Sequence, residues 1–181
     1  VHVIGEIIGA VGFSNPRLYA HFRLVSDPEH WYVLRGREEG FTQVDQSAVS
    51  SSGSALGGNA IWNHPLDIHY GTDSVEGWPR LLLEVWYLDD FDRNELAGYG
   101  MCFVPPSPGS YRLDCATWRP QGSFTDKLLA KFLGAPPQLR EASTAALGAD
   151  RAELMTDSAG TALVQLEVLV SGFAGRNVRM G

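Results

Sequence analysis

The sequence has few cysteines and few lysines. Its 181 residues include Cys102 and Cys115, which do not form a CxxC motif, and no further cysteine. A secreted disulfide framework is therefore unsupported, and we expect two buried thiols in a reducing compartment. Of the 14 basic residues only Lys127 and Lys131 are lysines, so the chain has no polybasic strip for anionic lipid.

Long apolar runs and positive net charge are also missing. No apolar run approaches the roughly 20 residues that span a bilayer, and the first residues do not have the pattern of a secretory signal peptide. The net charge of −7 argues against a nucleic-acid partner, since phosphate binding needs a basic face. Apolar residues make up 44% and charged residues 19%, an ordinary balance for one globular domain.

The most informative stretch runs from Trp78 to Gly100. Residues 81–88 are apolar on both alternating faces, with Glu84 as the only charge, which is typical of a strand inside a sheet. Residues 89–95 are too polar to be buried together, so they predict an exposed turn. Residues 96–104 then return as the next strand, and the whole stretch predicts a central hairpin.

The rest of the chain predicts more strands and one helix. Alternating or β-branched segments indicate strands at 1–8, 18–24, 31–34, 41–44, 60–70 and 111–115. Segments 151–156 and 161–170 suggest a final hairpin that turns at Asp157–Gly160. Ser123–Leu133 has an apolar stripe, a capping box and a following glycine, so it predicts a helix.

These elements predict a mainly β fold, an antiparallel β-sandwich of about eight strands with one short inserted helix. We expect one domain over residues 1–172 and a loose C-terminal tail at 173–181. The Ser/Gly-rich residues 46–59 predict a flexible surface loop within that domain.

No catalytic motif is present, and we predict no catalytic residue, no cofactor and no enzymatic activity. A nucleophile elbow, a cysteine paired with a histidine and a phosphate-cradling glycine pattern are all missing. The best transition-metal candidates are His64, Asp67 and His69. Asp67 and His69 share one strand face and His64 takes the other, which makes half a zinc site at best.

Outward aromatic side chains are better indicators of binding. The alternation of side chains along a strand leaves some of five aromatic residues facing outward, and the alternative is that they fill the core. The five residues are Tyr19, Trp31, Trp86, Tyr99 and Trp118. An exposed edge strand offers a further route, in which a partner adds its own strand to the sheet.

Several longer motifs resemble the B9 domain family, a C2-like branch, in matching order over most of residues 1–120. The resemblance rests on residues 1–10, 42–45, 62–69, 77–81, 96–100 and 113–120. It implies a C2-like antiparallel β-sandwich. The Ser/Gly-rich residues 46–59 depart from the family pattern and resemble an enlarged loop.

The resemblance also implies a function. B9 domain proteins are scaffold subunits of the B9/tectonic-type (Meckel syndrome) complex at the ciliary transition zone, needed for cilium assembly and for gating membrane protein entry. The implied partners are other B9 domain proteins (B9 domain-containing protein 1 and the Meckel syndrome type 1 protein) and tectonic-type membrane proteins. The implied location is the cytoplasm and cytoskeleton at the base of the cilium, in the transition zone and basal body.

Residues 12–19 and 85–98 also resemble the metal loops of C2 domains, so the alternative is a calcium- or phospholipid-docking module. The weak calcium candidates are Asn15, Asp89, Asp92 and Glu95. A calcium ion wants six to eight oxygen ligands, whereas Asn15 is neutral and Tyr87 stands at another ligand position. Direct membrane contact is possible in this alternative, but the charge of the chain does not support it.

Overall fold

A computed structural model describes residues 1–45, 58–120 and 156–172. These residues form nine strands and no helix. The strands are β1 His2–Phe13, β2 Leu18–Val25, β3 Trp31–Gly36, β4 Glu39–Phe41, β5 Gly58–Thr72, β6 Arg80–Leu88, β7 Asn94–Phe103, β8 Gly109–Pro120 and β9 Thr156–Leu169. No helix in this part of the chain has the length and hydropathy to cross a membrane.

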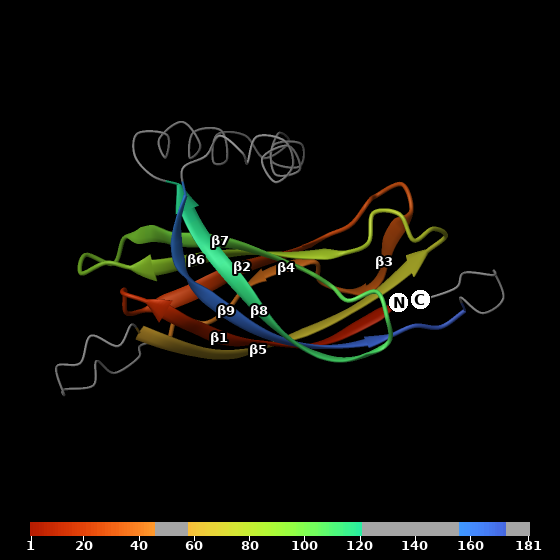
Figure 1. Ribbon diagram of the computed structural model, residues 1–181, viewed down its shortest axis with the longest axis horizontal. Coiled ribbons are helices and arrows are strands. Elements are labelled where there is room, and N and C mark those ends of the chain that lie inside the picture. The colour runs from red at the N-terminus through yellow and green to blue at the C-terminus, as the bar shows by residue number, and fades with distance from the viewer. Residues whose placement is uncertain (46–57, 121–155, 173–181) are drawn as a thin grey trace. The chain divides into compact units, whose positions relative to one another are not determined.

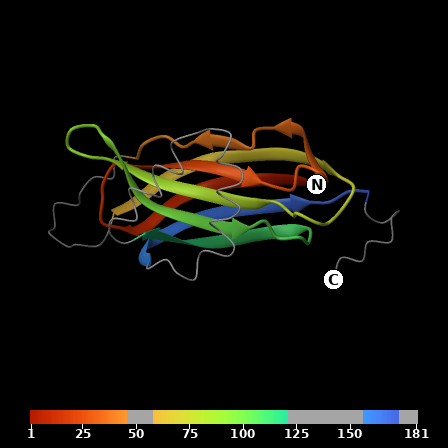
Figure 2. The same cartoon turned by 90° about the horizontal axis from the view of Figure 1, so that it is seen from above.

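The chain divides into two compact units, Val1–Thr117 with Ala159–Gly181, and Trp118–Ser158. The strands follow one order of hydrogen-bonded neighbours, β3-β5-β1-β9-β8-β7-β6-β2-β4. In the first unit β1 and β5 run side by side below β2 and β6, which Figures 1 and 2 show from two directions. The sheet therefore curls until its two halves face each other.

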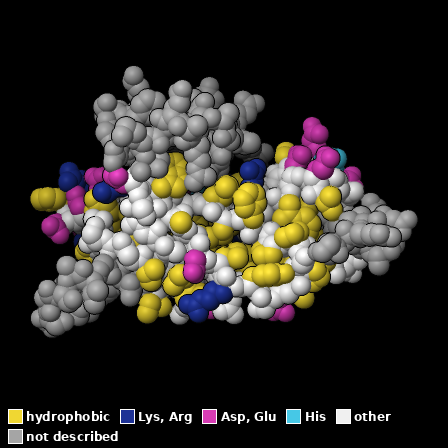
Figure 3. Space-filling model, in the orientation of Figure 1, with side chains coloured by type: hydrophobic (Ala, Val, Ile, Leu, Met, Phe, Trp, Pro, Cys, Tyr) yellow, Lys and Arg dark blue, Asp and Glu magenta, His cyan; other side chains and the backbone are white. Residues whose placement is uncertain are grey.

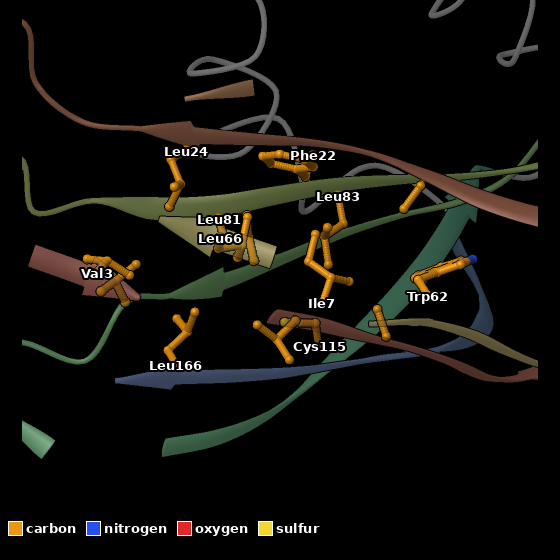
Figure 4. Packing of buried hydrophobic residues seen from close by; sticks show 14 of the residues in the cluster. Val3, Ile7, Phe22, Leu24, Trp62, Leu66, Leu81, Leu83, Cys115 and Leu166 are labelled. Atoms are coloured by element: carbon orange, nitrogen blue, oxygen red, sulfur yellow. The ribbon is translucent and has the colours of Figure 1, made fainter. Parts of the chain in front are cut away.

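The core of the first unit lies between these two halves. Val3, Ile7 and Leu166 point from β1 and β9 toward Phe22 and Leu83 on β2 and β6 (Figure 4). The alternation predicted for residues 81–88 is confirmed on one face, where every second residue from Leu81 to Val85 is buried. The other face of β6 is half-buried rather than covered.

The mainly β prediction is confirmed, with nine strands in the described residues instead of about eight. The predicted final hairpin is wrong, because β9 continues through the expected turn and pairs with β1. Gly160 lies inside β9, where a Cβ would be 2.6 Å from the ring of Phe13, so packing and not turning requires this glycine.

Three predicted features fall wholly or partly outside the described residues. The helix at 123–133 and the tail at 173–181 lie outside them. The loop predicted at 46–59 lies outside them as well, except for Gly58 and Asn59, which begin β5.

The prediction of two free thiols is also wrong. Cys102 on β7 and Cys115 on β8 form a disulfide, with their Cα atoms 5.6 Å apart. The two residues lie on neighbouring strands, which brings their side chains within bonding distance despite a separation of 13 residues. This pairing was not visible in the spacing of the cysteines.

Candidate functional site

The acidic turn between β6 and β7 is held by an arginine from another loop. Arg17, just before β2, donates from Nη1 to the main-chain oxygen of Asp89 at 3.0 Å. Its Nη2 forms an ion pair with Asp92. Charged side chains of both signs gather at the end where this turn lies (Figure 3). Arg17 and Asp92 both adopt positive φ angles of 59°, a conformation that is uncommon for residues other than glycine.

A second arginine, Arg93, pairs with Asp89 within the same turn. The Asp89 carboxylate accepts hydrogen bonds from the main-chain N–H groups of Phe91 at 2.8 Å and Arg93 at 2.9 Å. It also accepts one from the Arg93 guanidinium at 2.7 Å. These bonds lower the pKa of Asp89, with the main-chain bond from Arg93 as the largest cause. The carboxylate oxygens of Asp89 are occupied by these hydrogen bonds. The side chain is also only 17% exposed, so solvent reaches little of it.

The four calcium candidates have different partners in the structure. The structure brings Asp89 and Asp92 together through Arg17, while Glu95 lies on β7 opposite Tyr87. Asn15 accepts a hydrogen bond from the neighbouring Ser14 hydroxyl at 3.4 Å. In the part of the chain that the structure describes, no group of three or more His, Cys, Asp or Glu residues is placed to hold a metal ion.

The three transition-metal candidates lie on opposite faces of β5, as the alternation of side chains along a strand predicts. His64 points into the unit against Phe22, with ring centroids 5.2 Å apart, and burial lowers its pKa. Asp67 and His69 lie on the outer face, where His2 of β1 joins them. His2 hydrogen-bonds Asp67 at 2.7 Å and stacks on His69 at 5.1 Å. Sequence reasoning missed His2, because the β1–β5 register that places it there is a long-range pairing.

Glu84 lies among aromatic rings on the outer face of β2, β6 and β7. Its carboxylate accepts a hydrogen bond from the Trp86 indole at 3.2 Å and faces His21 at 3.4 Å. Burial, and then the negative charge of Glu84, raise the pKa of Tyr99 to about 12. The same two causes raise the pKa of Tyr19. Tyr19, Trp86 and Tyr99 thus surround one carboxylate.

The tryptophans divide between core and surface. Trp31 is buried, with its ring edge-on to Trp78 at 4.9 Å, so it braces the core and does not serve as an outward contact. Trp86 and Trp118 are half-buried. Sequence reasoning did not identify the apolar side chains that are most exposed in the described part of the chain, which are Tyr32, Leu34, Phe41, Ile61, Phe91 and Phe103. Tyr32 and Leu34 lie on an edge strand, a position that depends on topology and has no local signal.

Taken together, the described residues have the architecture of a mainly β protein in which the strand pairs β1–β5, β1–β9, β2–β6 and β6–β7 are antiparallel. The family model described as B9-C2, Ciliary basal body-associated, B9 protein, matches residues 1–169. The chain belongs to this B9 family.

Curated relatives agree over nearly the whole chain. The chain is similar to B9 domain-containing protein 2 of Mus musculus, 46% identical over 173 residues that cover 96% of this chain and 94% of the relative. The Homo sapiens protein of the same name is 44% identical with the same coverage. B9 domain-containing protein 1 of Mus musculus is 27% identical over 150 residues, covering 82% of this chain and 71% of the relative.

Among solved structures, the chain is similar to a C2 domain of plant Extended Synaptotagmin 1. The TM-score is 0.44 and the sequence identity is 12%, with 93% of this chain and 96% of that chain covered.

Proposed function

We propose that this protein is a non-enzymatic scaffold subunit of a heteromeric complex of B9 domain proteins at the ciliary transition zone. The observation that carries the proposal is the match to B9 domain-containing protein 2 over 96% of the chain, within a family described as ciliary basal body-associated. In this role the protein acts in cilium assembly and in gating the entry of membrane proteins. One B9 domain over residues 1–172 would supply its binding surfaces.

The proposed partners are B9 domain-containing protein 1, the Meckel syndrome type 1 protein and tectonic-type membrane proteins. The proposed location is the cytoplasm and cytoskeleton at the cilium base, in the transition zone and basal body. The acidic turn supports a scaffold role, because Arg17 and Arg93 occupy the carboxylates that a calcium ion would need.

The test is size-exclusion chromatography with light scattering. The chain is run alone and then with B9 domain-containing protein 1 and the Meckel syndrome type 1 protein, each time with calcium and with chelator. A heteromer that is indifferent to calcium supports the proposal. A chain that stays monomeric beside both proteins contradicts it.

The second candidate is a calcium- or phospholipid-docking module. The observation that favours it is Phe91, which is 79% exposed in the turn between β6 and β7. The measurement is the melting temperature with calcium and chelator, followed by sedimentation with phosphatidylserine vesicles. A ligand that binds the folded state must raise the melting temperature, so no shift and no sedimentation would exclude this candidate.

A further inference from the structure

Among the described residues, strand β3 has a backbone edge that pairs with no other strand. It stands at one end of the strand order, with β5 as its strand neighbour in the described residues. On β5, Tyr70 exchanges both of its backbone hydrogen bonds with Val1, at 2.8 and 2.9 Å, so its N–H and C=O point away from β3. Val33 is opposite Tyr70. It therefore lies in a non-hydrogen-bonded pair, and its own N–H and C=O point outward along the free edge.

The side chains on this edge are apolar. Tyr32, Val33 and Leu34 are 60%, 38% and 56% exposed, three consecutive apolar residues on an edge strand. The ring of Tyr32 covers Gly71, because a Cβ at Gly71 would be 2.4 Å from the Tyr32 Cζ. One face of the Tyr32 ring therefore packs against Gly71, and the rest of the side chain is exposed to solvent. An exposed apolar edge strand is a template for pairing with another strand.

The opposite end of the strand order does not offer a comparable edge. Strand β4 has three residues, and the chain after it is fastened to β5 by side chains. Gln43 donates to the main-chain oxygen of Trp62 at 2.5 Å, and Asp45 accepts from the main-chain N–H of Ile61 at 2.9 Å. These contacts occupy the first half of β5. Of the two terminal strands, β3 is therefore the one with room for a partner strand.

The charges beside this edge indicate what the partner carries. Arg35 and Arg37 are exposed at the end of β3, and neither forms an ion pair within the described residues. Arg17, Arg23 and Arg93 each have a carboxylate partner. Arg35 does act on one carboxylate at longer range, because the pKa of Asp67 is lowered first by its hydrogen bond with His2 and, as a smaller cause, by the charge of Arg35. In a chain of net charge −7, two arginines outside any ion pair of the described residues and beside an apolar edge complement an acidic ligand.

We propose that β3 accepts an extended segment of a partner protein as an added strand. The segment carries apolar side chains against Tyr32 and Leu34 and carboxylates beside Arg35 and Arg37. Its backbone bonds to the outward N–H and C=O of Val33. The inference rests on the proposed function, since it assigns the surface through which the subunit holds a partner in the complex.

The first test follows backbone protection. Amide hydrogen exchange is measured by NMR on the chain alone and with B9 domain-containing protein 1, and then with the Meckel syndrome type 1 protein. The Val33 amide exchanges fast in the free chain and becomes protected in the complex. The Tyr32 amide, which faces Gly71 on β5, is protected in both states. A Val33 amide that stays unprotected in every complex that forms overturns the inference.

The second test uses variants with matched controls. Leu34→Lys and the double change Arg35→Glu with Arg37→Glu each weaken binding about tenfold or more, because they oppose the apolar and the acidic part of the segment. Phe103→Lys on β7 and Arg112→Glu on β8 remove comparably exposed groups elsewhere and leave binding unchanged. Melting temperatures near that of the wild type show that each variant is folded.

The outcomes separate the inference from the proposed function. If the wild type binds a B9 protein and the β3 variants bind equally well, the inference fails and the scaffold proposal stands. If the wild type binds neither protein, the scaffold proposal fails, and the inference fails with it. A wild-type dimer that Leu34→Lys breaks means that β3 pairs with a second copy of this chain, which overturns the assigned partner.

Discussion

Arg17, immediately before β2, forms an ion pair with Asp92 in the turn between β6 and β7. The two residues are 75 positions apart in the chain, and their contact joins two loops at one end of the first unit. A guanidinium carries its positive charge permanently and donates in a planar fork. Two of the chain's own cations, Arg17 and Arg93, therefore pair with Asp92 and Asp89 in this turn.

Arg17→Gln removes the ion pair and the hydrogen bond to Asp89. The Asp92 side chain is 77% exposed, so the pair itself contributes little, and the bond to the main-chain oxygen of Asp89 adds to it. We expect a loss of about 1 kcal/mol in the free energy of unfolding, measured by urea denaturation. The control is Arg112→Gln, because Arg112 is exposed and forms no ion pair within the described residues. An equal loss of unfolding free energy in both variants would mean that the contacts of Arg17 with Asp89 and Asp92 add no specific stability.

The disulfide predicts a redox-dependent stability. Cys102 and Cys115 close a loop with a sequence separation of 13, and cross-linking a loop of this length stabilises a protein by about 3 kcal/mol. We expect reduction to lower the melting temperature by roughly 6–12 °C. The variant Cys102→Ala with Cys115→Ala would melt like the reduced protein and ignore the reductant. Labelling of both thiols in the untreated protein by a mass-tagged reagent would contradict the bond.

The sequence reveals local structure better than it reveals long-range contacts. Alternation predicted the buried face of β6 and the outward position of Asp67, because side-chain direction follows from strand geometry alone. The contact of His2 with Asp67 depends on the β1–β5 register, across 65 residues. The acidic turn was predicted, but the pairing of Arg17 with Asp92 was not, since it requires two loops to meet.

Whether a strand lies at the edge or in the middle of a sheet is a second property that the local sequence pattern does not reveal. Residues 31–34 are all apolar, which would suit a strand in the core as well as one at an edge. In the structure Trp31 is buried and the next three residues are exposed. The difference arises from the strand order, which gives β3 a neighbour on one side.

Gly160 lies within β9 at a position where the neighbouring atoms leave no room for a side chain. A Cβ at this position would lie 2.6 Å from the Phe13 ring and 2.8 Å from the Val11 main-chain oxygen. Gly160→Ala should therefore cost about 1–3 kcal/mol of stability, as overpacking in a filled site does. The control is Gln165→Ala, an exposed residue of the same strand. Chemical denaturation measures both, and an unchanged midpoint for Gly160→Ala would mean that Phe13 does not pack there.

Tyr99 predicts a loss of stability at high pH. Its pKa in the folded protein is about 12, against an ordinary value of 10.0, first because the ring is buried and then because Glu84 is near. A raised pKa means that the folded state holds the proton more tightly than the unfolded state does. The stabilisation is therefore complete below pH 10 and is lost as the pH rises through about 12.

Ultraviolet titration of phenolate absorbance measures this pKa, with Tyr99→Phe identifying the transition by its disappearance. Glu84→Gln removes the smaller of the two causes, so the pKa of Tyr99 should fall and still remain above 10.0. Glu6→Gln, a change on the half-buried outer face of β1, serves as the matched control and should leave the Tyr99 transition in place. If Glu84→Gln left the transition unmoved, the carboxylate would not act on the phenol, and burial alone would account for the shift.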